Sequence, residues 1–403
     1  MRSQIDDIII GAGLTGLAVV VGLDPARKVV VFTGQDGQGL RSYPGTQTPY
    51  AHFGPGGLGA YWHGVIPLCD RTSLVEDRDA FARLFSHFYP SSRIRPEGRA
   101  NRLFVPWFPI RPTKELAALK EKRPNLTTVD ASATRIRSEA GGFVVEAGGS
   151  ETRASRLWLA AGAVSTPKLL ETLTGKTSTD SRMISDHIIG YAGQIPASAA
   201  VKDIMRSIRR DLAGLDIPAF YNERGDILYT IRPAMFDFAT LDKGFEKRAV
   251  FGLPLSRGLA GLQGRVSPGL IAEALFNKAA IGRKAKAYSV YYQAAVPGLY
   301  ALDRQSALTG PVDQDAIRVL GVRAQQEAPF ANLMPSHHPE RYLPGIHMHG
   351  SLDTTELKDL MTLENDAHVL HVVDSSAMSV IGPEHHSFRV MARAYSMARS
   401  LSQ

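Results

Sequence analysis

A glycine-rich turn near the start of the chain is the feature that most constrains its fold. Residues 11–16 follow an apolar run at 8–10 and precede a stretch at 17–23 that suits a helix, so the segment predicts strand, tight turn and helix. In a G-x-G-x-x-G turn, the first glycine permits the turn, the second lets the backbone approach a pyrophosphate, and the third lets the helix pack on the strand. The N–H groups at the helix N-terminus would then face the phosphates. The spacing predicts a dinucleotide site that includes Gly11, Gly13, Leu14, Thr15 and Gly16.

The end of the second predicted strand departs from the usual pattern. Residues 28–32 form a β-branched run, and an acidic residue after this strand ordinarily binds the ribose hydroxyls. Here Thr33 occupies that place, and Asp36 follows three residues later. Either Asp36 takes over the contact, or Thr33 or the backbone holds the ribose.

The rest of the chain predicts an α/β protein with two domains, because 403 residues are too many for one typical domain. Strands broken by polar turns fill residues 127–161, which is typical of a β-meander. Helices are predicted at 76–88, 112–122, 166–173 and 387–401, and a further strand at 368–373. Between 195 and 337 the pattern loosens. We therefore expect a Rossmann-type domain at 1–194, completed by 338–403, around an inserted α+β substrate domain at 195–337.

Composition excludes several other classes of protein. No run of about eighteen apolar residues is present, so no transmembrane segment is expected. The polar N-terminus is unlike a signal peptide, and the single cysteine, Cys69, excludes an internal disulfide and a cysteine-ligated iron–sulfur cluster. These features favour a cytoplasmic location. The net charge is +7, but the basic residues are dispersed and no nucleic-acid motif accompanies them.

A second segment favours FAD over NAD. Residues 157–163 read Leu-Trp-Leu-Ala-Ala-Gly-Ala and are followed by Ser165-Thr166-Pro167, which resembles a strand and turn of FAD-binding Rossmann proteins. The small residues Ala161 and Gly162 would let the backbone pass beside the adenosine diphosphate. No second G-x-G-x-x-G follows, so no separate nicotinamide domain is indicated. The expected domain at 1–194 and 338–403 is therefore an FAD-binding one.

Five segments together resemble the glucose–methanol–choline (GMC) family of FAD oxidoreductases. This chain would be a short member of that family, and it is somewhat similar to the pyranose oxidases. They are the glycine turn, residues 56–64, 157–167, 185–187 and 347–391. The resemblance implies that the loop at 56–64 lies over the isoalloxazine ring, with Gly57 and Trp62 in contact with the cofactor. In that subfamily a histidine of this loop can be bonded to the flavin. Tyr61 falls at that place and His63 follows two residues later, so the FAD is expected to be non-covalent.

The resemblance also implies catalytic roles in the C-terminal block. Residues 346–351 are similar to the family's H-x-x-G-T segment, and residues 372–376 to its V-x-D-A-S strand end, which would place Asp374 and Ser375 at the cofactor. Residues 384–388 stand at its N/H-P segment. Carried over by position, His347 and His385 face the flavin. A one-residue slip would replace His385 by His386, and His349 competes with His347.

The residues themselves also favour proton chemistry here. Eight of the twelve histidines lie between residues 337 and 386. An unperturbed imidazole titrates near neutral pH, so it can take the proton of an alcohol while the carbon gives hydride to a flavin. No cysteine and no H-E-x-x-H accompany these histidines, so no metal site is expected. His187 and His371 are expected to be structural.

The sequence thus predicts an enzyme that oxidises an alcohol on a small molecule, such as a sugar or sugar-like hydroxyl. The electron acceptor stays open among oxygen, a quinone and a carrier protein. Dispersed cationic side chains suggest a phosphorylated or nucleotide-linked substrate; they are Arg206, Arg209, Arg210, Arg283, Lys284 and Lys286. The alternatives are a natural-product tailoring enzyme performing desaturation, reduction or redox-neutral chemistry, and a non-catalytic flavoprotein subunit.

Overall fold

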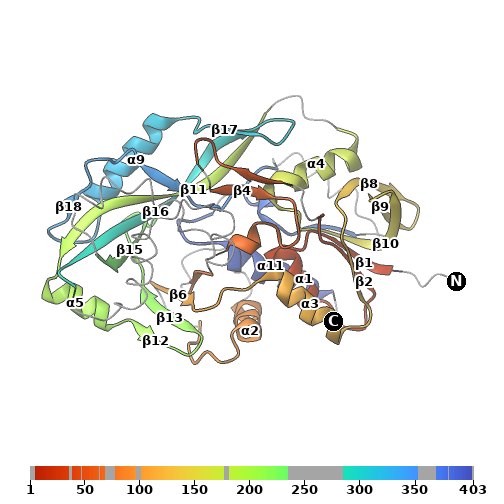
Figure 1. The fold of residues 1–403 in the computed structure, drawn as a ribbon, viewed down its shortest axis with the longest axis horizontal. Coiled ribbons are helices and arrows are strands. Elements are labelled where there is room, and N and C mark those ends of the chain that lie inside the picture. The colour runs from red at the N-terminus through yellow and green to blue at the C-terminus, as the bar shows by residue number, and fades with distance from the viewer. Residues whose placement is uncertain are drawn as a thin grey trace.

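Two large sheets lie toward opposite ends of the long axis of the molecule (Figure 1). The computed structural model describes residues 5–35, 39–46, 48–62, 64–68, 78–96, 101–176, 181–234, 285–352, 369–379 and 381–401. Several residues considered above lie outside these ranges: Asp36, His63, Cys69, Arg283, Lys284 and His368.

The first sheet contains a run of five parallel strands in the order β7-β2-β1-β10-β20. These strands are β1 (Ile5–Ile10), β2 (Val29–Phe32), β7 (Leu126–Val129), β10 (Ser150–Leu159) and β20 (Val369–Val372). All four residues of β2 and the last four of β1 are buried, as expected for apolar strands covered on both faces. The last strand comes from the C-terminal block, so this sheet joins both ends of the described chain.

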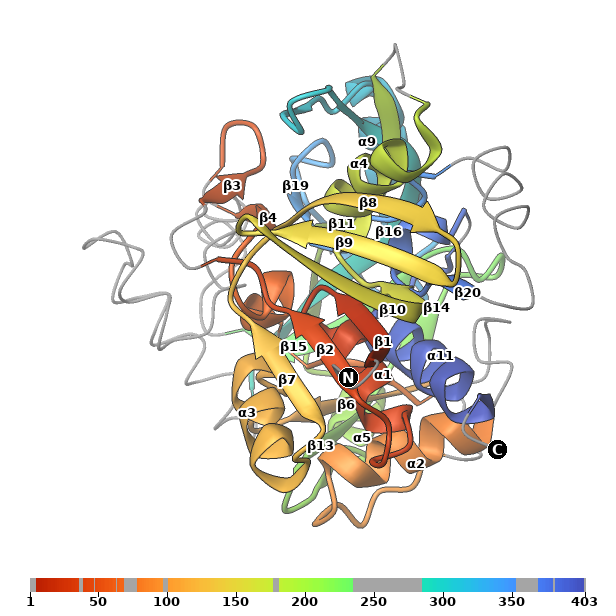
Figure 2. The same cartoon turned by 90° about the vertical axis from the view of Figure 1, so that its right-hand side faces the viewer.

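Each face of the first sheet has its own cover. On one face, α1 (Leu14–Gly22) packs beside α11 (Ser387–Ser400), and both contribute to a cluster with Ile9, Val31 and Trp158. On the other face lie α4 (Gly162–Thr174) and the antiparallel strands β8 (Ala133–Glu139) and β9 (Gly142–Ala147), which continue into the first half of β10 (Figure 2). The predicted strands of the 127–161 region are confirmed, as is the strand predicted near 368–373.

The second sheet is antiparallel and has the order β14-β15-β16-β11-β18, with β17 beside β16 and β19 beside β11. Its long central strands are β11 (Arg182–Pro196) and β16 (Ala287–Leu302). The others are β14 (Phe220–Tyr221), β15 (Leu228–Pro233), β17 (Leu308–Thr309), β18 (Met334–Pro335) and β19 (Tyr342–Pro344). Two helices, α5 (Ala199–Arg206) and α9 (Gln314–Gln326), contribute side chains to the core on one face of the sheet. The expected boundary at 194/195 falls within β11.

A four-stranded sheet joins the early and middle parts of the chain. It has the order β12-β13-β6-β5, formed by β5 (Ile66–Pro67), β6 (Arg102–Pro106), β12 (Arg209–Arg210) and β13 (Gly214–Pro218). Nearby, α2 (Arg78–Phe88) packs Phe81 on Phe388 of α11, with ring centroids 5.1 Å apart. The helix predicted at 112–122 is confirmed as α3 (Pro112–Lys122).

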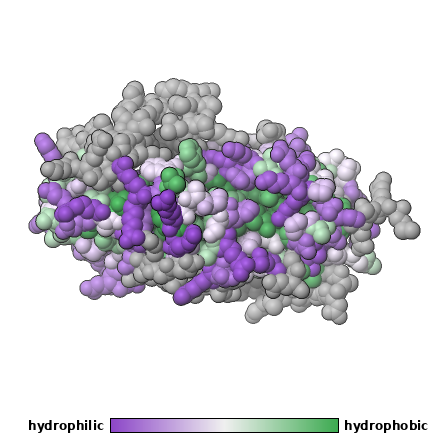
Figure 3. Space-filling model, turned by 90° about the horizontal axis from the view of Figure 1, so that it is seen from below, coloured by the Kyte–Doolittle hydropathy of each residue, from purple (hydrophilic) through white to green (hydrophobic). Residues whose placement is uncertain are grey.

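On the face seen in Figure 3, hydrophilic side chains are spread around smaller hydrophobic areas. Within the described residues, no helix combines the length and the apolar character needed to cross a membrane. The remaining short elements are β3 (Leu40–Ser42), β4 (Pro49–His52), and the 3-10 turns η1 (Gly57–Tyr61) and η3 (Ser375–Ala377).

Candidate active site

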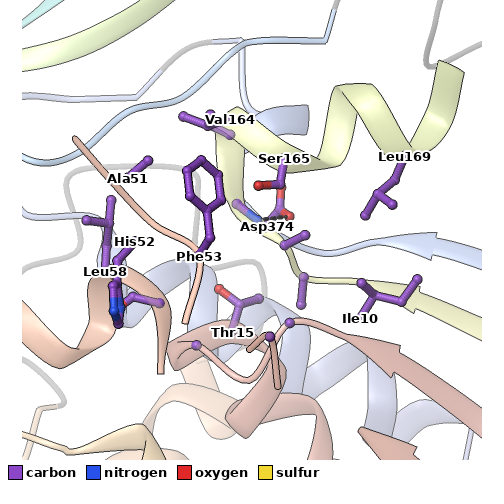
Figure 4. A pocket seen from close by; sticks show the side chains of 18 of the residues that line it. Ile10, Thr15, Ala51, His52, Phe53, Leu58, Val164, Ser165, Leu169 and Asp374 are labelled. Atoms are coloured by element: carbon purple, nitrogen blue, oxygen red, sulfur yellow. Dashed lines mark hydrogen bonds between the residues drawn. The ribbon is translucent and has the colours of Figure 1, made fainter. Parts of the chain in front are cut away.

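A cavity of about 710 Å³ extends from the glycine turn after β1 to the histidines of the C-terminal block. Its size lies within the usual range for cofactor and substrate sites. Thr15, Phe53 and Asp374 come from three separate segments and surround the same space (Figure 4). The carboxyl ends of β1, β2 and β10 form one end of the cavity, and residues 346–348 and 386–387 form part of its wall.

The glycine turn has the geometry that a dinucleotide phosphate requires. Gly11 has φ +108°, and a Cβ there would lie 2.2 Å from the carbonyl oxygen of Ala160. A Cβ on Gly16 would lie 1.9 Å from the carbonyl oxygen of Gly11, so helix and strand could not pack as they do. A Cβ on Gly13 would meet only the carbonyl oxygen of Gly56, at 3.6 Å. Gly13 therefore leaves open space at the N-terminus of α1, where a phosphate would be stabilised by backbone N–H groups.

The carboxylate of Asp374 joins separate segments of the cavity wall through hydrogen bonds. It accepts hydrogen bonds from the backbone N–H of Gly162 at 2.8 Å and the hydroxyl of Thr166 at 2.6 Å. It also accepts from the N–H and hydroxyl of Ser376, at 2.9 and 2.5 Å. The next residue, Ser375, donates its hydroxyl to the carbonyl oxygen of Met348 at 2.7 Å. Asp374 therefore orders the turn at 160–162, although it also lines the cavity.

Most of the candidate residues meet around this one cavity. Those that line it are Gly11, Gly13, Leu14, Thr15, Thr33, Gly57, Ala161, Gly162, His347, Asp374, Ser375 and His386. Four others do not line it, namely Gly16, Trp62, His349 and His385. Trp62 is buried in the core beside α1, and its carbonyl oxygen accepts a hydrogen bond from Arg111 at 3.0 Å.

Five imidazoles gather at the histidine end of the cavity. The ring of His347 lies 5.2 Å from that of His385 and 5.0 Å from that of His386, measured between centroids. His187 stacks on His386 at 5.4 Å and meets His347 edge-on at 5.1 Å. The ring of His349 lies 5.7 Å from His386. Residues from β11, from the 346–351 segment and from the loop before α11 thus form one cluster.

Burial keeps three of these imidazoles neutral. It lowers the pKa of His187 to about 3 and that of His349 to about 4. It also lowers the pKa of His386 well below the ordinary value, with a further contribution from the nearby His187. The Nε2 of His187 lies 2.7 Å from the carbonyl oxygen of Gly382, which can only accept a hydrogen bond. The proton of neutral His187 is therefore on Nε2.

Asp186 is a buried acid at this site that the sequence pattern did not single out as a site residue. Its Oδ1 accepts hydrogen bonds from the backbone N–H groups of His187 and His347, both at 2.7 Å. Its Oδ2 accepts from the hydroxyl of Tyr43, which is also buried. Burial raises the pKa of Asp186 to about 7, in opposition to these hydrogen bonds. In the sequence, Asp186 stands beside His187 within the 185–187 segment that resembles the GMC family.

The remaining candidate features lie elsewhere. His371 packs on Trp158 at 4.3 Å between ring centroids, and burial lowers its pKa to about 4, in keeping with the structural role expected for it. In the part of the chain that the structure describes, no three His, Cys, Asp or Glu side chains are placed to hold a metal ion. None of the described basic residues proposed to attract an anionic substrate lines the cavity: Arg206, Arg209, Arg210 and Lys286.

Comparisons with known proteins identify the fold. An FAD-dependent oxidoreductase from Chaetomium thermophilum aligns over 99% of both chains, with 13% sequence identity and a TM-score of 0.53. Pyridoxine 4-oxidase from Mesorbium loti aligns over 98% of this chain and 99% of that one, with 13% identity and a TM-score of 0.48. A fungal aryl-alcohol oxidase aligns over 99% of this chain and 98% of that one, with 13% identity and a TM-score of 0.49. No family model and no curated protein matches the sequence. The expected fold is confirmed at this level: the chain folds like an FAD-dependent oxidoreductase.

Proposed function

We propose that this protein is an FAD-dependent oxidoreductase of GMC type that oxidises an alcohol. The observation that carries the proposal is a single cavity with a phosphate-binding turn at one end and an imidazole cluster at the other. The open space at Gly13 and the N-terminus of α1 suit the pyrophosphate of FAD, and Ala161 and Gly162 suit its adenosine side. FAD is also named for the similar structure from Chaetomium thermophilum.

The domain division follows from the same proposal. The parallel sheet, together with α1, α4, α11 and the meander, forms a Rossmann-type FAD-binding domain from residues 1–194 and 338–403. The substrate domain at residues 195–337 contributes most strands of the antiparallel sheet, while β19 and most of β11 in that sheet come from the FAD-domain segments. The strand β11 brings His187 to the histidine cluster. The reaction takes place where the two meet.

His347 is the proposed general base. Bound FAD supplies the acceptor for the hydride of the alcohol carbon. His347 takes the hydroxyl proton, because it lines the cavity and its ring lies 5.2 Å from His385. The half-buried His385 orients the alcohol by a hydrogen bond. His386 lines the cavity itself and stays neutral, so it packs against the cofactor without placing a positive charge there.

The final helix contributes to the same end of the cavity. Ser387 and Val390 from the first turn of α11 line it, so the helix N-terminus points toward the bound cofactor. The positive end of the helix dipole stabilises negative charge nearby by about 0.3–1 kcal/mol. This favours a cofactor that gains negative charge as the alcohol is oxidised.

The experiment has two steps. Purified protein is first denatured and its released cofactor identified, with FAD expected rather than FMN. The holoprotein is then mixed anaerobically with a panel of alcohols that contains sugars, phosphorylated sugars and aryl alcohols, and flavin absorbance is followed. Loss of absorbance with one class identifies the substrate. A protein that carries no FAD, or whose flavin no alcohol reduces, contradicts the proposal.

A further inference from the structure

The ribose of the cofactor lacks its expected partner in this chain. The strand β2 ends at Phe32, and Thr33 stands where an acidic side chain ordinarily binds the ribose hydroxyls. Thr33 is buried, and its hydroxyl donates to Oδ1 of Asp130 at 2.8 Å, which is closer than the carbonyl oxygens of Gly34 at 3.1 Å and Val129 at 3.3 Å. A threonine hydroxyl has a single proton, so in this arrangement it is not free to donate to a ligand.

Asp130 lies at the same edge of the sheet, one strand further along. It directly follows β7, which pairs in parallel with β2 so that Phe32 is opposite Val129. Asp130 is exposed and does not itself line the cavity, whereas its hydrogen-bond partner Thr33 and the residues that follow it in the chain, Ala131 and Ser132, do. In the described part of the chain, Oδ2 of Asp130 accepts no hydrogen bond, so this oxygen is available to a ligand.

We propose that Asp130 binds the adenosine ribose hydroxyls of FAD, in place of the missing acid after β2. The inference rests on the proposed function, because it assumes FAD in this cavity. Thr33 is then a positioning residue: its hydroxyl fixes one carboxylate oxygen of Asp130 and leaves the other toward the ribose. A carboxylate suits this role because it accepts hydrogen bonds from both hydroxyls of a ribose.

The test measures binding to cofactor-free protein. FAD, ADP and 2′,3′-dideoxy-ADP are titrated into wild type and Asp130→Asn, and the ADP to dideoxy-ADP affinity ratio is compared. A hydrogen bond to a charged group predicts that wild type favours ADP by about 10- to 100-fold. Asp130→Asn should bind FAD and ADP about 10- to 100-fold more weakly, and the ratio should fall toward one. Thr33→Val should give an intermediate loss.

The control is Asp315→Asn, which removes an exposed carboxylate on α9 and should leave all three affinities unchanged. If Asp130→Asn weakens ADP and dideoxy-ADP equally, or changes neither, the ribose contact is refuted while FAD binding stands. If wild type does not distinguish the two nucleotides, the contact is refuted as well. If wild type binds no FAD, the proposed function fails with it.

Discussion

Oδ1 of Asp186 accepts a hydrogen bond from the backbone N–H of His347 at 2.7 Å, across 161 residues of sequence. The same oxygen accepts from the N–H of His187, so one buried carboxylate holds two segments of the imidazole cluster. Because backbone N–H groups set where their side chains begin, Asp186 determines the place of the proposed base. It acts without lining the cavity itself.

Two replacements of Asp186 should therefore distinguish the effect of its hydrogen bonds on stability from the effect of its charge. Asp186→Ala leaves two buried N–H groups and the Tyr43 hydroxyl without their acceptor, which should lower the free energy of unfolding by about 3–5 kcal/mol. Asp186→Asn keeps an oxygen for both N–H groups and should lose less than half of that. Chemical denaturation measures both. Equal stability of Asp186→Ala and wild type would show that these hydrogen bonds do not support the site.

Loss of the proposed base should slow chemistry without loss of cofactor. His347→Ala and His385→Ala are expected to fold, bind FAD and reduce it about 100- to 10,000-fold more slowly with a working alcohol. The double variant should lose less than the product of the two effects, because the pair acts as a unit. Anaerobic stopped-flow measures the rate. His349→Ala and His386→Ala test the neighbouring positions, and His371→Ala is the control on β20. Normal rates in all five variants would contradict alcohol oxidation by this cluster.

Two glycines of the same turn should respond differently to substitution. Gly13→Val should retain the stability of the cofactor-free protein but lose FAD, because its Cβ enters the space reserved for the pyrophosphate. Gly16→Val should destabilise the fold itself, because its Cβ would overlap the carbonyl oxygen of Gly11. Thermal unfolding without cofactor and flavin content after purification separate the two effects. A yellow Gly13→Val protein would place the cofactor elsewhere.

The cofactor should come free of the protein on acid precipitation. Tyr61 stands where a bonding histidine is found in the subfamily that this loop resembles, and a phenol there gives no histidyl bond. Its ring meets that of His52 edge-on at 5.6 Å, and His52 itself lines the cavity. After treatment with trichloroacetic acid, all flavin absorbance should be in the supernatant. Flavin that remains with the pellet would contradict this expectation, and His52→Ala would then test the nearest described imidazole.

Stability should fall steeply below pH 6.5. The pKa values of His187, His349 and His386 are lowered in the folded protein, so below pH 6.5 the unfolded chain binds three protons that the folded protein does not bind. The stability that these neutral imidazoles contribute is therefore present above pH 6.5 and lost as the pH falls. Asp186 has the opposite sign, because its raised pKa of about 7 favours the folded state at low pH and this contribution is lost as the pH rises toward 7. Near pH 5 these four groups give a net difference of about two protons, or about 3 kcal/mol per pH unit, and the buried His371, whose pKa is lowered to about 4, adds to the slope in the same direction.

Denaturation of the cofactor-free protein at pH 5 and pH 6 measures this slope. His349→Gln should reduce it by about 1 kcal/mol per pH unit, because the unfolded variant no longer takes up a proton at this position. His337→Gln, at an exposed loop position, should leave it unchanged. A slope that is the same in wild type and His349→Gln would show that His349 does not titrate as its burial requires.

Local patterns in the sequence predicted the elements that form the proposed cofactor site. The glycine turn, the meander strands and β20 are each specified by neighbouring residues, because periodicity and glycine spacing are local signals. The helix predicted to begin near Thr166 instead begins at Gly162. Pro167 favours the first turn of a helix, which made a later start plausible. The hydrogen bonds from Gly162 and Thr166 to Asp374 support the earlier start, and they come from 212 and 208 residues away.

Large separations in sequence also explain which contacts at the site could not be predicted. Asp186 lies 143 residues from Tyr43 and 161 from His347, and Thr33 lies 97 residues from Asp130. No periodicity within one segment can indicate such pairs. His187 was expected to be a structural residue, yet its ring lies at the centre of the imidazole cluster because β11 carries it there. The resemblance to a known family indicated candidate residues, but their hydrogen-bonding partners could be identified only from the fold.

The bonds of Asp374 also impose an order on biosynthesis. A ribosome that has produced the glycine turn, the meander and α4 has not yet produced the carboxylate that fastens Gly162, nor the helix that packs against α1. The nascent chain therefore holds an incomplete cavity until Asp374, 212 residues after Gly162, has been translated. On the proposed function, capture of FAD is then one of the last events of maturation, and FAD supply affects how much newly made protein stays folded.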